Sequence, residues 1–550
     1  MKFIKNIYQK FAPSHKAIAM GLLVALSHSA CDDNFLDEEP QDFLNSDVVL
    51  TNEEGFESAI VGLHESARHL YFREDGSKMQ SMYYGTDIAI TGDRTLADFH
   101  DYPTWLTPTL YAVEHYWNWA YRNMMPRANT VIQYAEEGDF WESEEDRNAV
   151  IAEARFFRAY AYNFLANLYG GVPIVDQLYR APKADFTRAS REEVYDFARQ
   201  DLEFASEWLP ETTDMEGRIT KAAADHLLSE VYINLGRYQD AVESASRVID
   251  DEKYHLMTER FGAHTDEPGD VISDLHGQDN INRSSGNMET IWALQFEPRT
   301  VPGGTVENSK WKGVTWLRAW GPKWWDITDP NGEKGMQLSV DSLGRGVAWV
   351  RPTDYFNYEV WEDYPNDIRN SEHNIRREYY YNNPESEYFG QKVEFDPDRL
   401  DSMVQYYPML RKVEGDAEKK EGANYGRSLK DVYLMRVAET YLLRAEAYFL
   451  LGDAANAAAD INAVRGRANA SLVTPGEVDL DYILDERARE LIIEENRRLT
   501  LNRMGKLVER TRLYNPQSGP SIKDYHNLFP IPQSTIDANI DKMMEQNPEY

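Results

Sequence analysis

The sequence has almost no cysteine and no long apolar run. Its 550 residues include one cysteine, Cys31, so a conventional hydrophobic core must stabilise the fold in place of disulfide bonds. The longest apolar stretch, Ala17 to Leu26, has about ten residues, roughly half of what a membrane-spanning helix needs. The sequence also lacks a Gly-rich phosphate-binding loop, an HExxH zinc helix and a CxxC pair. We therefore expect neither nucleotide-dependent nor zinc-dependent chemistry, and no cofactor.

Positive charge is also scarce. The chain has 93 acidic and 58 basic residues, for a net charge of −35. Because a strongly negative surface repels phosphate backbones, we do not expect a nucleic acid as a partner. The 12 histidines are scattered without the spacing of metal ligands, so no metal site is predicted.

The first thirty residues have the layout of a secretory signal peptide, with four lysines and no acid before the apolar stretch. A cysteine directly after such a segment is similar to a bacterial lipobox, in which the cysteine becomes the acylated N-terminus and anchors the protein to a membrane. His28 departs from this pattern, because lipoboxes usually have Leu three residues before the cysteine. An ordinary signal peptide is the alternative. We predict a lipoprotein signal peptide over 1–30, then acylated Cys31 and an acidic tether over 31–52.

Helical periodicity dominates two parts of the chain, residues 53–255 and 429–550. In the segment 153–173, aromatic and aliphatic residues recur at spacings of three and four, which predicts one wide buried helix face that ends at Gly170. A Leu-Gly-x-Tyr motif at Leu235, followed by Ala241 and Ala245, is typical of a tetratricopeptide hairpin.

A second hairpin motif begins at Leu451, 216 residues after the first, so the two copies do not form a continuous array in the sequence. The intervening residues 256–428 contain turn-forming stretches, short apolar runs and eight of the 13 tryptophans. We predict that this insertion is irregular and carries the binding site, because loops on a rigid scaffold commonly carry function.

Four segments, in order along the chain, resemble the RagB/SusD family of outer-membrane nutrient-uptake lipoproteins. The CDDNFLDEEP stretch that begins at Cys31 is also typical of this family. The resemblance implies a mainly α-helical, single compact domain with tetratricopeptide-type hairpins and a loop-rich insertion with short strands. The four segments are EARFFRAYAYNFLANLYGGVPIV, LKDVYLMRVAETYLLRAEAYFLLGD, LDERARELIIEENRRLTLNRMGKL and LFPIPQSTIDANIDKMMEQNPEY.

The resemblance further implies a cell-surface lipoprotein without catalytic activity, which captures oligosaccharide or polysaccharide and delivers it to a SusC-like TonB-dependent transporter. One alternative is a peptide- or protein-capturing lipoprotein of the same lid type. Another is a glycosidase, which would need a carboxylate pair in a cleft. In a chain with 93 acids such pairs arise by chance, so we interpret the carboxylates as solvated surface charge.

The first candidate glycan site is the stretch Lys310 to Thr328. A sugar ring has an apolar face and a rim of hydroxyls, so its site needs flat aromatic rings and polar side chains. Since Gly321 and Pro322 interrupt any helix here, we expect some rings to splay into a loop, with core packing or transporter contact as the alternative. The basic residues favour a carboxylated or sulfated glycan, unless they balance neighbouring acids. The candidates are Trp311, Trp316, Trp320, Trp324, Trp325, Arg318 and Lys323.

The second candidate site is the stretch Thr86 to Trp105, a region that in related proteins tends to border the glycan site. The family motif that contains Trp117, by contrast, is expected to supply mostly core and transporter-contact positions. The candidates in the second stretch are Asp93, Arg94, His100, Tyr102 and Trp105.

Overall fold

The computed structural model describes residues 46–72, 78–93, 99–296, 314–337, 343–415, 417–420, 423–428 and 430–550. The predicted signal peptide and three candidate residues, Cys31, Arg94 and Trp311, lie outside these ranges. The chain divides into two compact units, residues 1–51 and 52–550. The short helix α2 (Ser46–Val49) belongs to the first unit. None of the helices in the described ranges combines the length and the apolar character that a membrane span requires.

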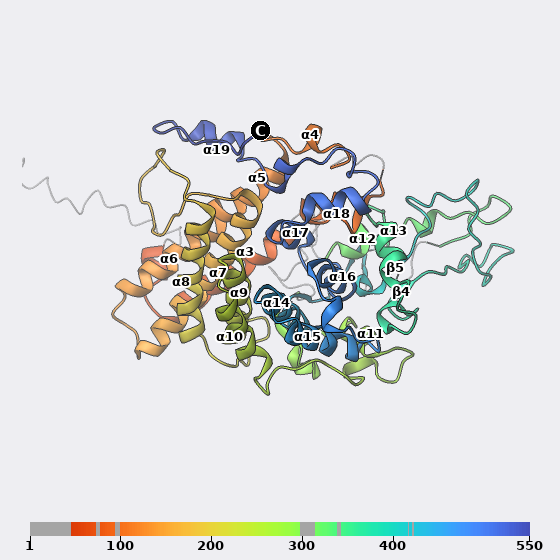
Figure 1. Ribbon diagram of the computed structural model, residues 1–550, viewed down its shortest axis with the longest axis horizontal. Coiled ribbons are helices and arrows are strands. Elements are labelled where there is room, and N and C mark those ends of the chain that lie inside the picture. The colour runs from red at the N-terminus through yellow and green to blue at the C-terminus, as the bar shows by residue number, and fades with distance from the viewer. Residues whose placement is uncertain are drawn as a thin grey trace, which may run out of the picture. The chain divides into compact units, whose positions relative to one another are not determined.

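The second unit is mainly α-helical, as the sequence predicts, and Figure 1 shows its helices beside an irregular, loop-rich part. A π-helical turn, η3 (Trp119–Met124), joins two of the helices. The helices are α3 (Glu53–Phe72), α4 (Tyr102–Trp105), α5 (Tyr111–Asn118), α6 (Met125–Glu137), α7 (Glu144–Tyr169), α8 (Arg191–Trp208), α9 (Lys221–Asn234), α10 (Tyr238–Ile249), α11 (Val271–Leu275), α12 (Trp316–Trp320), α13 (Asp354–Asn357), α14 (Val437–Leu450), α15 (Ala454–Arg467), α16 (Leu480–Leu491), α17 (Arg497–Arg503), α18 (Leu507–Tyr514) and α19 (Gln533–Ala538).

Local sequence sets the ends of the long helices. α7 begins after Ser143, whose side chain accepts a hydrogen bond from the Asp146 amide, and it ends before Gly170, which has a φ of 75°. α8 begins with a capping box, because Ser190 and Glu193 each accept a hydrogen bond from the other's backbone amide. The predicted helix, which begins by residue 153 and ends at Gly170, is confirmed as part of α7.

Both predicted tetratricopeptide-type hairpins are present, as α9 with α10 and α14 with α15. Each turn contains a glycine in the left-handed region, Gly236 at φ 71° and Gly452 at φ 83°. Ala241 and Ala245 are fully buried, which lets α10 pack closely on α9. Although the two hairpins are far apart in the sequence, α10 packs against α14 and the hairpins lie side by side.

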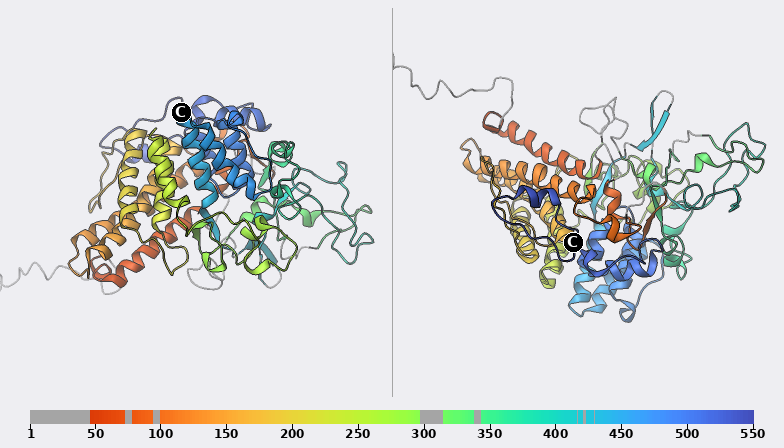
Figure 2. Two further views of the ribbon diagram at one scale, coloured as in Figure 1. Left: turned by 60° about the horizontal axis from the view of Figure 1, so that its bottom comes forward. Right: turned by 90° about the horizontal axis from the view of Figure 1, so that it is seen from above.

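The insertion contains little regular structure, and its loops extend away from the helices in both views of Figure 2. Short antiparallel pairs connect it to the rest of the unit, with Thr290 opposite Arg436 and Ala89 opposite Pro352. Each sheet among the described residues has two strands. The pairs are β1 (Ala89–Thr91) with β3 (Val350–Pro352), β2 (Thr290–Leu294) with β8 (Val432–Arg436), β4 (Ile375–Arg376) with β5 (Met409–Leu410), and β6 (Ala417–Lys420) with β7 (Ala423–Ser428).

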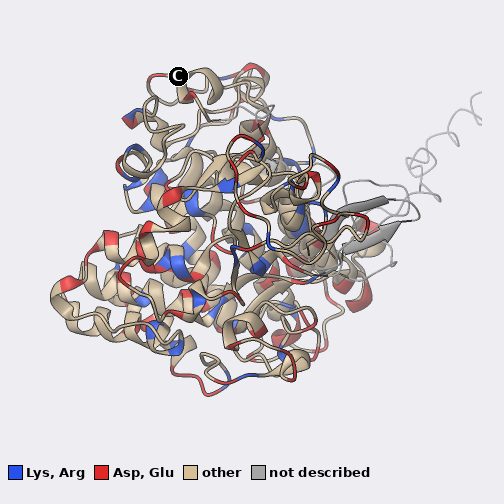
Figure 3. Cartoon of the chain, turned by 90° about the vertical axis from the view of Figure 1, so that its right-hand side faces the viewer, with Lys and Arg blue, Asp and Glu red and all other residues tan. Residues whose placement is uncertain are grey.

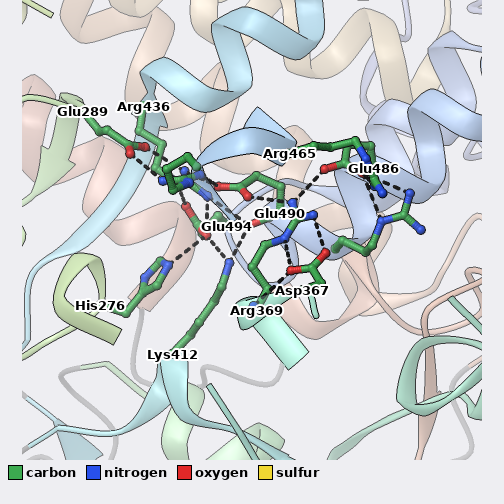
Figure 4. Close-up of polar contacts among 12 residues, drawn as sticks. His276, Glu289, Asp367, Arg369, Lys412, Arg436, Arg465, Glu486, Glu490 and Glu494 are labelled. Carbon is green, nitrogen blue, oxygen red and sulfur yellow. Dashed lines mark hydrogen bonds and ion pairs between the residues drawn. The ribbon is translucent and has the colours of Figure 1, made fainter. Parts of the chain in front are cut away.

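A network of buried ion pairs joins α16 to other segments (Figure 4). Glu490 lies 2.9 Å from Arg369 of the insertion and 2.7 Å from Arg436 at the end of β8, and it also pairs with Arg467 of α15. Glu486, one turn earlier, lies 2.7 Å from Arg369. These side chains are at most 3% exposed, so the expectation of solvated surface charge is wrong for them.

Other charged residues do lie at the surface, such as Glu509 and Asp524, whose side chains are 64% and 88% exposed. On the side of the unit shown in Figure 3, acidic and basic residues are interspersed among the described helices and loops. Acidic and basic residues thus occur near one another along these helices and loops.

Candidate functional site

The tryptophan-rich stretch folds into α12 and a 3₁₀ turn, Trp324–Asp326. Trp316, Trp320 and Trp324 are 8%, 1% and 0% exposed. The ring of Trp316 lies 5.6 Å from that of Phe72, and the ring of Trp320 packs edge-on to Tyr83 at 5.1 Å. These three rings belong to the core and present no open face to a ligand, which differs from the splayed arrangement that the sequence suggests.

Trp325 has a different environment. Its side chain is half-buried, and its indole nitrogen donates a hydrogen bond to the Gly346 carbonyl at 2.7 Å. The guanidinium of Arg345 lies 4.7 Å from the centroid of its ring, within the range of a cation–π contact. Among the described residues, Arg345 forms no hydrogen bond or ion pair of its own, so its donors are available to a ligand.

A close backbone contact holds this pair of residues in place. A Cβ atom added to Gly346 would lie 2.2 Å from the Pro322 carbonyl oxygen and 2.4 Å from the Gly321 carbonyl carbon. Next to it, the Ala348 amide donates to the Gly321 carbonyl at 2.9 Å. Only glycine at position 346 permits this approach, which brings Arg345 to Trp325.

The pairing of β1 with β3 brings further polar residues to the same place. The Gly92 amide donates a hydrogen bond to the Trp349 carbonyl at 3.3 Å. This contact places the next residue, Asp93, beside the end of the β1–β3 pair. The Lys323 ammonium lies 3.9 Å from an Asp93 carboxylate oxygen, and the Arg318 guanidinium lies 5.4 Å from the Trp349 ring centroid. We refer to these residues as the aromatic–cation surface: Asp93, Arg318, Lys323, Trp325, Arg345 and Trp349.

The other candidates from Thr86 to Trp105 take separate positions. The His100 ring contacts the Thr91 hydroxyl beside β1. Tyr102 is 0% exposed, accepts a hydrogen bond from Arg498 at 3.0 Å, and has a pKa raised by its burial. Trp105 is half-buried in α4, which lies apart from α12 in Figure 1. The structure thus brings Asp93 to Lys323 but buries Tyr102 and keeps Trp105 away from α12.

Two members of this surface, Arg345 and Trp349, were not predicted as site residues. They lie in the short stretch LGRGVAWVRP, which has no helical or alternating pattern. The one feature of this stretch that could have indicated a site is the pair of glycines, Gly344 and Gly346, that flank Arg345, because glycine permits a close approach of another backbone segment. The partner in that approach, Gly321, is 25 residues away and could not be identified from the sequence.

The raised pKa of one carboxyl bears on the glycosidase alternative. Burial raises the pKa of Asp431 to about 6, which would suit a general acid. Its carboxylate oxygens already accept hydrogen bonds from the Phe296 amide and the Asn282 side chain, both at 2.7 Å. The Asp431 carboxylate therefore has a structural role, because it connects the start of β8 to the end of β2.

Comparison with known proteins gives two family matches. The model described as "SusD family" matches residues 289–550, and the model described as "Starch-binding associating with outer membrane" matches residues 34–233.

Individual relatives and solved structures agree with these matches. The chain is 26% identical to SusD-like protein P2 of Formosa agariphila, over 80% of this chain and 81% of that protein. It is 25% identical to the starch-binding protein SusD of Bacteroides thetaiotaomicron, over 72% of each. A laminarin-binding SusD-like protein superposes with a TM-score of 0.69 at 22% identity, covering 91% of this chain and 100% of that one. Surface glycan-binding protein A of Bacteroides thetaiotaomicron, solved in complex with laminarihexaose, superposes with a TM-score of 0.66 at 20% identity, covering 90% of this chain and 99% of that one.

Proposed function

Because the chain belongs to the SusD/RagB family, we propose that it is a non-catalytic, cell-surface lipoprotein of the outer membrane that binds glycans. In this proposal it captures an oligosaccharide or polysaccharide and delivers it to a SusC-like transporter. Support comes from relatives whose names record starch or laminarin binding, and from the family description that mentions the outer membrane.

The observation that carries the site is the pairing of half-buried Trp325 with Arg345. An indole ring can receive the apolar face of a sugar, and a neighbouring guanidinium can hydrogen-bond its hydroxyls. The Gly321–Gly346 contact fixes the backbone beside both residues, and the Trp325 indole is also held by its hydrogen bond to the Gly346 carbonyl, so the ring loses little conformational freedom on binding.

The free donors of Arg345 also favour a glycan that carries carboxylates or sulfates. Lys323 gives weaker support, because Asp93 lies 3.9 Å from it and offsets its charge. Neutral and anionic polysaccharides therefore both belong in the test.

The test replaces Trp325 with Ala and measures retention by affinity electrophoresis in gels that contain starch, laminarin, a uronic-acid polysaccharide or a sulfated galactan. We expect the wild type to be retarded by one class of glycan and Trp325→Ala to lose that retardation. Trp208→Ala is the matched control, because Trp208 is also half-buried but lies at the end of α8. Buried Trp320 and Trp324 are unsuitable, since their truncation would open core cavities costing about 3–5 kcal/mol.

Unchanged retention of a folded Trp325→Ala protein would contradict the proposed site. Release of reducing ends from the retained glycan would favour the glycosidase alternative. Failure of every glycan, together with retention on immobilised peptides, would favour the peptide-capturing alternative.

A further inference from the structure

A separate pocket of about 330 Å³ lies where three segments of the second unit meet. One wall is formed by α5, the turn η3 and the start of α6. The opposite walls are the loop 173–186 and the C-terminal residues 534–544. These two walls are tied together, because the Phe186 amide donates to the Asn539 side chain at 2.8 Å and Asn539 donates back to the Phe186 carbonyl at 2.9 Å.

The walls of this pocket are mostly apolar. Its size and lining are those of a small-molecule site, which is a hollow of roughly 300–1,000 Å³ with a few polar groups. The rings of Trp117 and Tyr121 lie 4.8 Å apart and form a continuous aromatic wall. Further apolar lining comes from Met125, Val175, Leu178 and Phe186.

One polar group in this wall, the indole N–H of Trp117, reaches solvent and has no partner among the described residues. Trp117 as a whole is 4% exposed. Trp119, two residues later, donates to the Ser66 carbonyl at 2.8 Å, as buried indoles usually do. The Trp117 N–H is therefore available to a ligand in the pocket that its ring lines.

A cation lies in the same wall. Arg122 belongs to η3, is exposed, and makes no hydrogen bond or ion pair within the described parts of the chain. Arginines elsewhere in this acidic protein are commonly paired, as Arg158 is with Asp201 at 2.7 Å. π-helical turns occur frequently at functional sites, and this one places Arg122 in the pocket lining close to Trp117.

We propose that this pocket binds a small carboxylate with a flat apolar ring system. The ring would lie against Trp117 and Tyr121, while the carboxylate would accept hydrogen bonds from Arg122 and from the Trp117 N–H. An uncharged apolar molecule would offer neither donor an acceptor, and a free sugar would match the apolar walls poorly. The site is distinct from the aromatic–cation surface and does not depend on the proposed function.

The probe is 2-naphthoate, with naphthalene-2-methanol as its uncharged counterpart. Binding is followed by nuclear magnetic resonance of the indole N–H groups, and the Trp117 signal is assigned from its loss in Trp117→Phe. We expect 2-naphthoate to shift this signal in a saturable manner. Arg122→Gln should weaken binding about tenfold, as the loss of one charge-assisted contact predicts.

Arg127→Gln is the matched control, because Arg127 lies five residues further on and points to Glu65, 3.2 Å away. It removes the same charge and should leave the affinity unchanged. Absence of a saturable shift, equal affinity for the alcohol, or equal weakening in both arginine variants would each overturn the proposal. Arg122 is exposed, so its replacement tests the proposal even if Trp117→Phe fails to fold.

Discussion

At the scale of single residues, the tryptophans between residues 316 and 325 show how burial decides the role of a side chain. Trp320 and Trp324 fill the core, whereas Trp325, directly after Trp324, is half-buried and carries an arginine over its ring. The sequence predicts an aromatic cluster here but not which ring faces outward. That choice depends on the short helix α12 and on the turn after Pro322.

Gly346 provides a test at this scale. We expect Gly346→Ala to lower the free energy of unfolding by about 1–3 kcal/mol, because its methyl group would overlap backbone atoms that cannot move aside. The same change should displace Arg345 and Trp325 and reduce glycan retention. Denaturant unfolding and affinity electrophoresis measure the two effects.

Gly476→Ala is the control for this prediction, since no atom lies within 4 Å of the Cβ that it adds. Equal stability of Gly346→Ala and wild type would show that the backbone contact with Pro322 is not tight.

At the scale of elements, α16 has an unexpected environment. Its sequence, LDYILDERAREL, is rich in charge and is typical of a solvent-exposed helix. In the fold Glu486, Arg487, Arg489 and Glu490 are all buried, and their partners come from the insertion, β8, α14 and α15. The ion pairs therefore fix the irregular insertion to the helical part.

Breaking this network of ion pairs should lower the stability of the fold. We expect Glu490→Gln to lower the free energy of unfolding by about 3 kcal/mol, because it leaves the buried guanidinium groups of Arg369, Arg436 and Arg467 short of a counter-charge. Denaturant titration measures the change. Glu509→Gln is the control, because the Glu509 side chain is 64% exposed, and it should change the free energy of unfolding by less than about 0.5 kcal/mol. Similar values for the two variants would contradict a structural role for the network.

At the scale of the whole molecule, buried carboxylates make stability depend on pH. Burial alone would raise the pKa of Glu486, but Arg369, Arg489 and Arg465 outweigh it and hold the pKa at about 2. Asp87 likewise has a pKa of about 2, because Arg497 and Arg510 outweigh its burial. Both native values lie below the ordinary values of 4.5 and 3.8.

Since the folded state holds these groups ionised, their stabilisation is complete above the unfolded-state pKa values and is lost as the pH falls through the native ones. We expect the melting temperature to fall steeply as the pH decreases from about 4.5 toward about 2. Circular dichroism melts across this range measure the effect. A melting temperature that stays constant down to pH values near 2 would contradict it.

The sequence by itself determined the helical class, the C-terminal end of α7 and the two tetratricopeptide-type hairpins. These features depend on local periodicity and on residues such as Gly170, Gly236 and Gly452, whose conformations are set within a few positions. The four ordered segments also identified the family, which the two family models confirm.

Only the tertiary structure decided which tryptophan is half-buried rather than buried, that Arg345 lies against its ring, and that the charges of α16 are buried. Each of these depends on contacts between distant residues, such as Gly321 with Gly346 or Glu490 with Arg369. Burial is a property of what packs on a side chain, and no local pattern records which distant segment will do so.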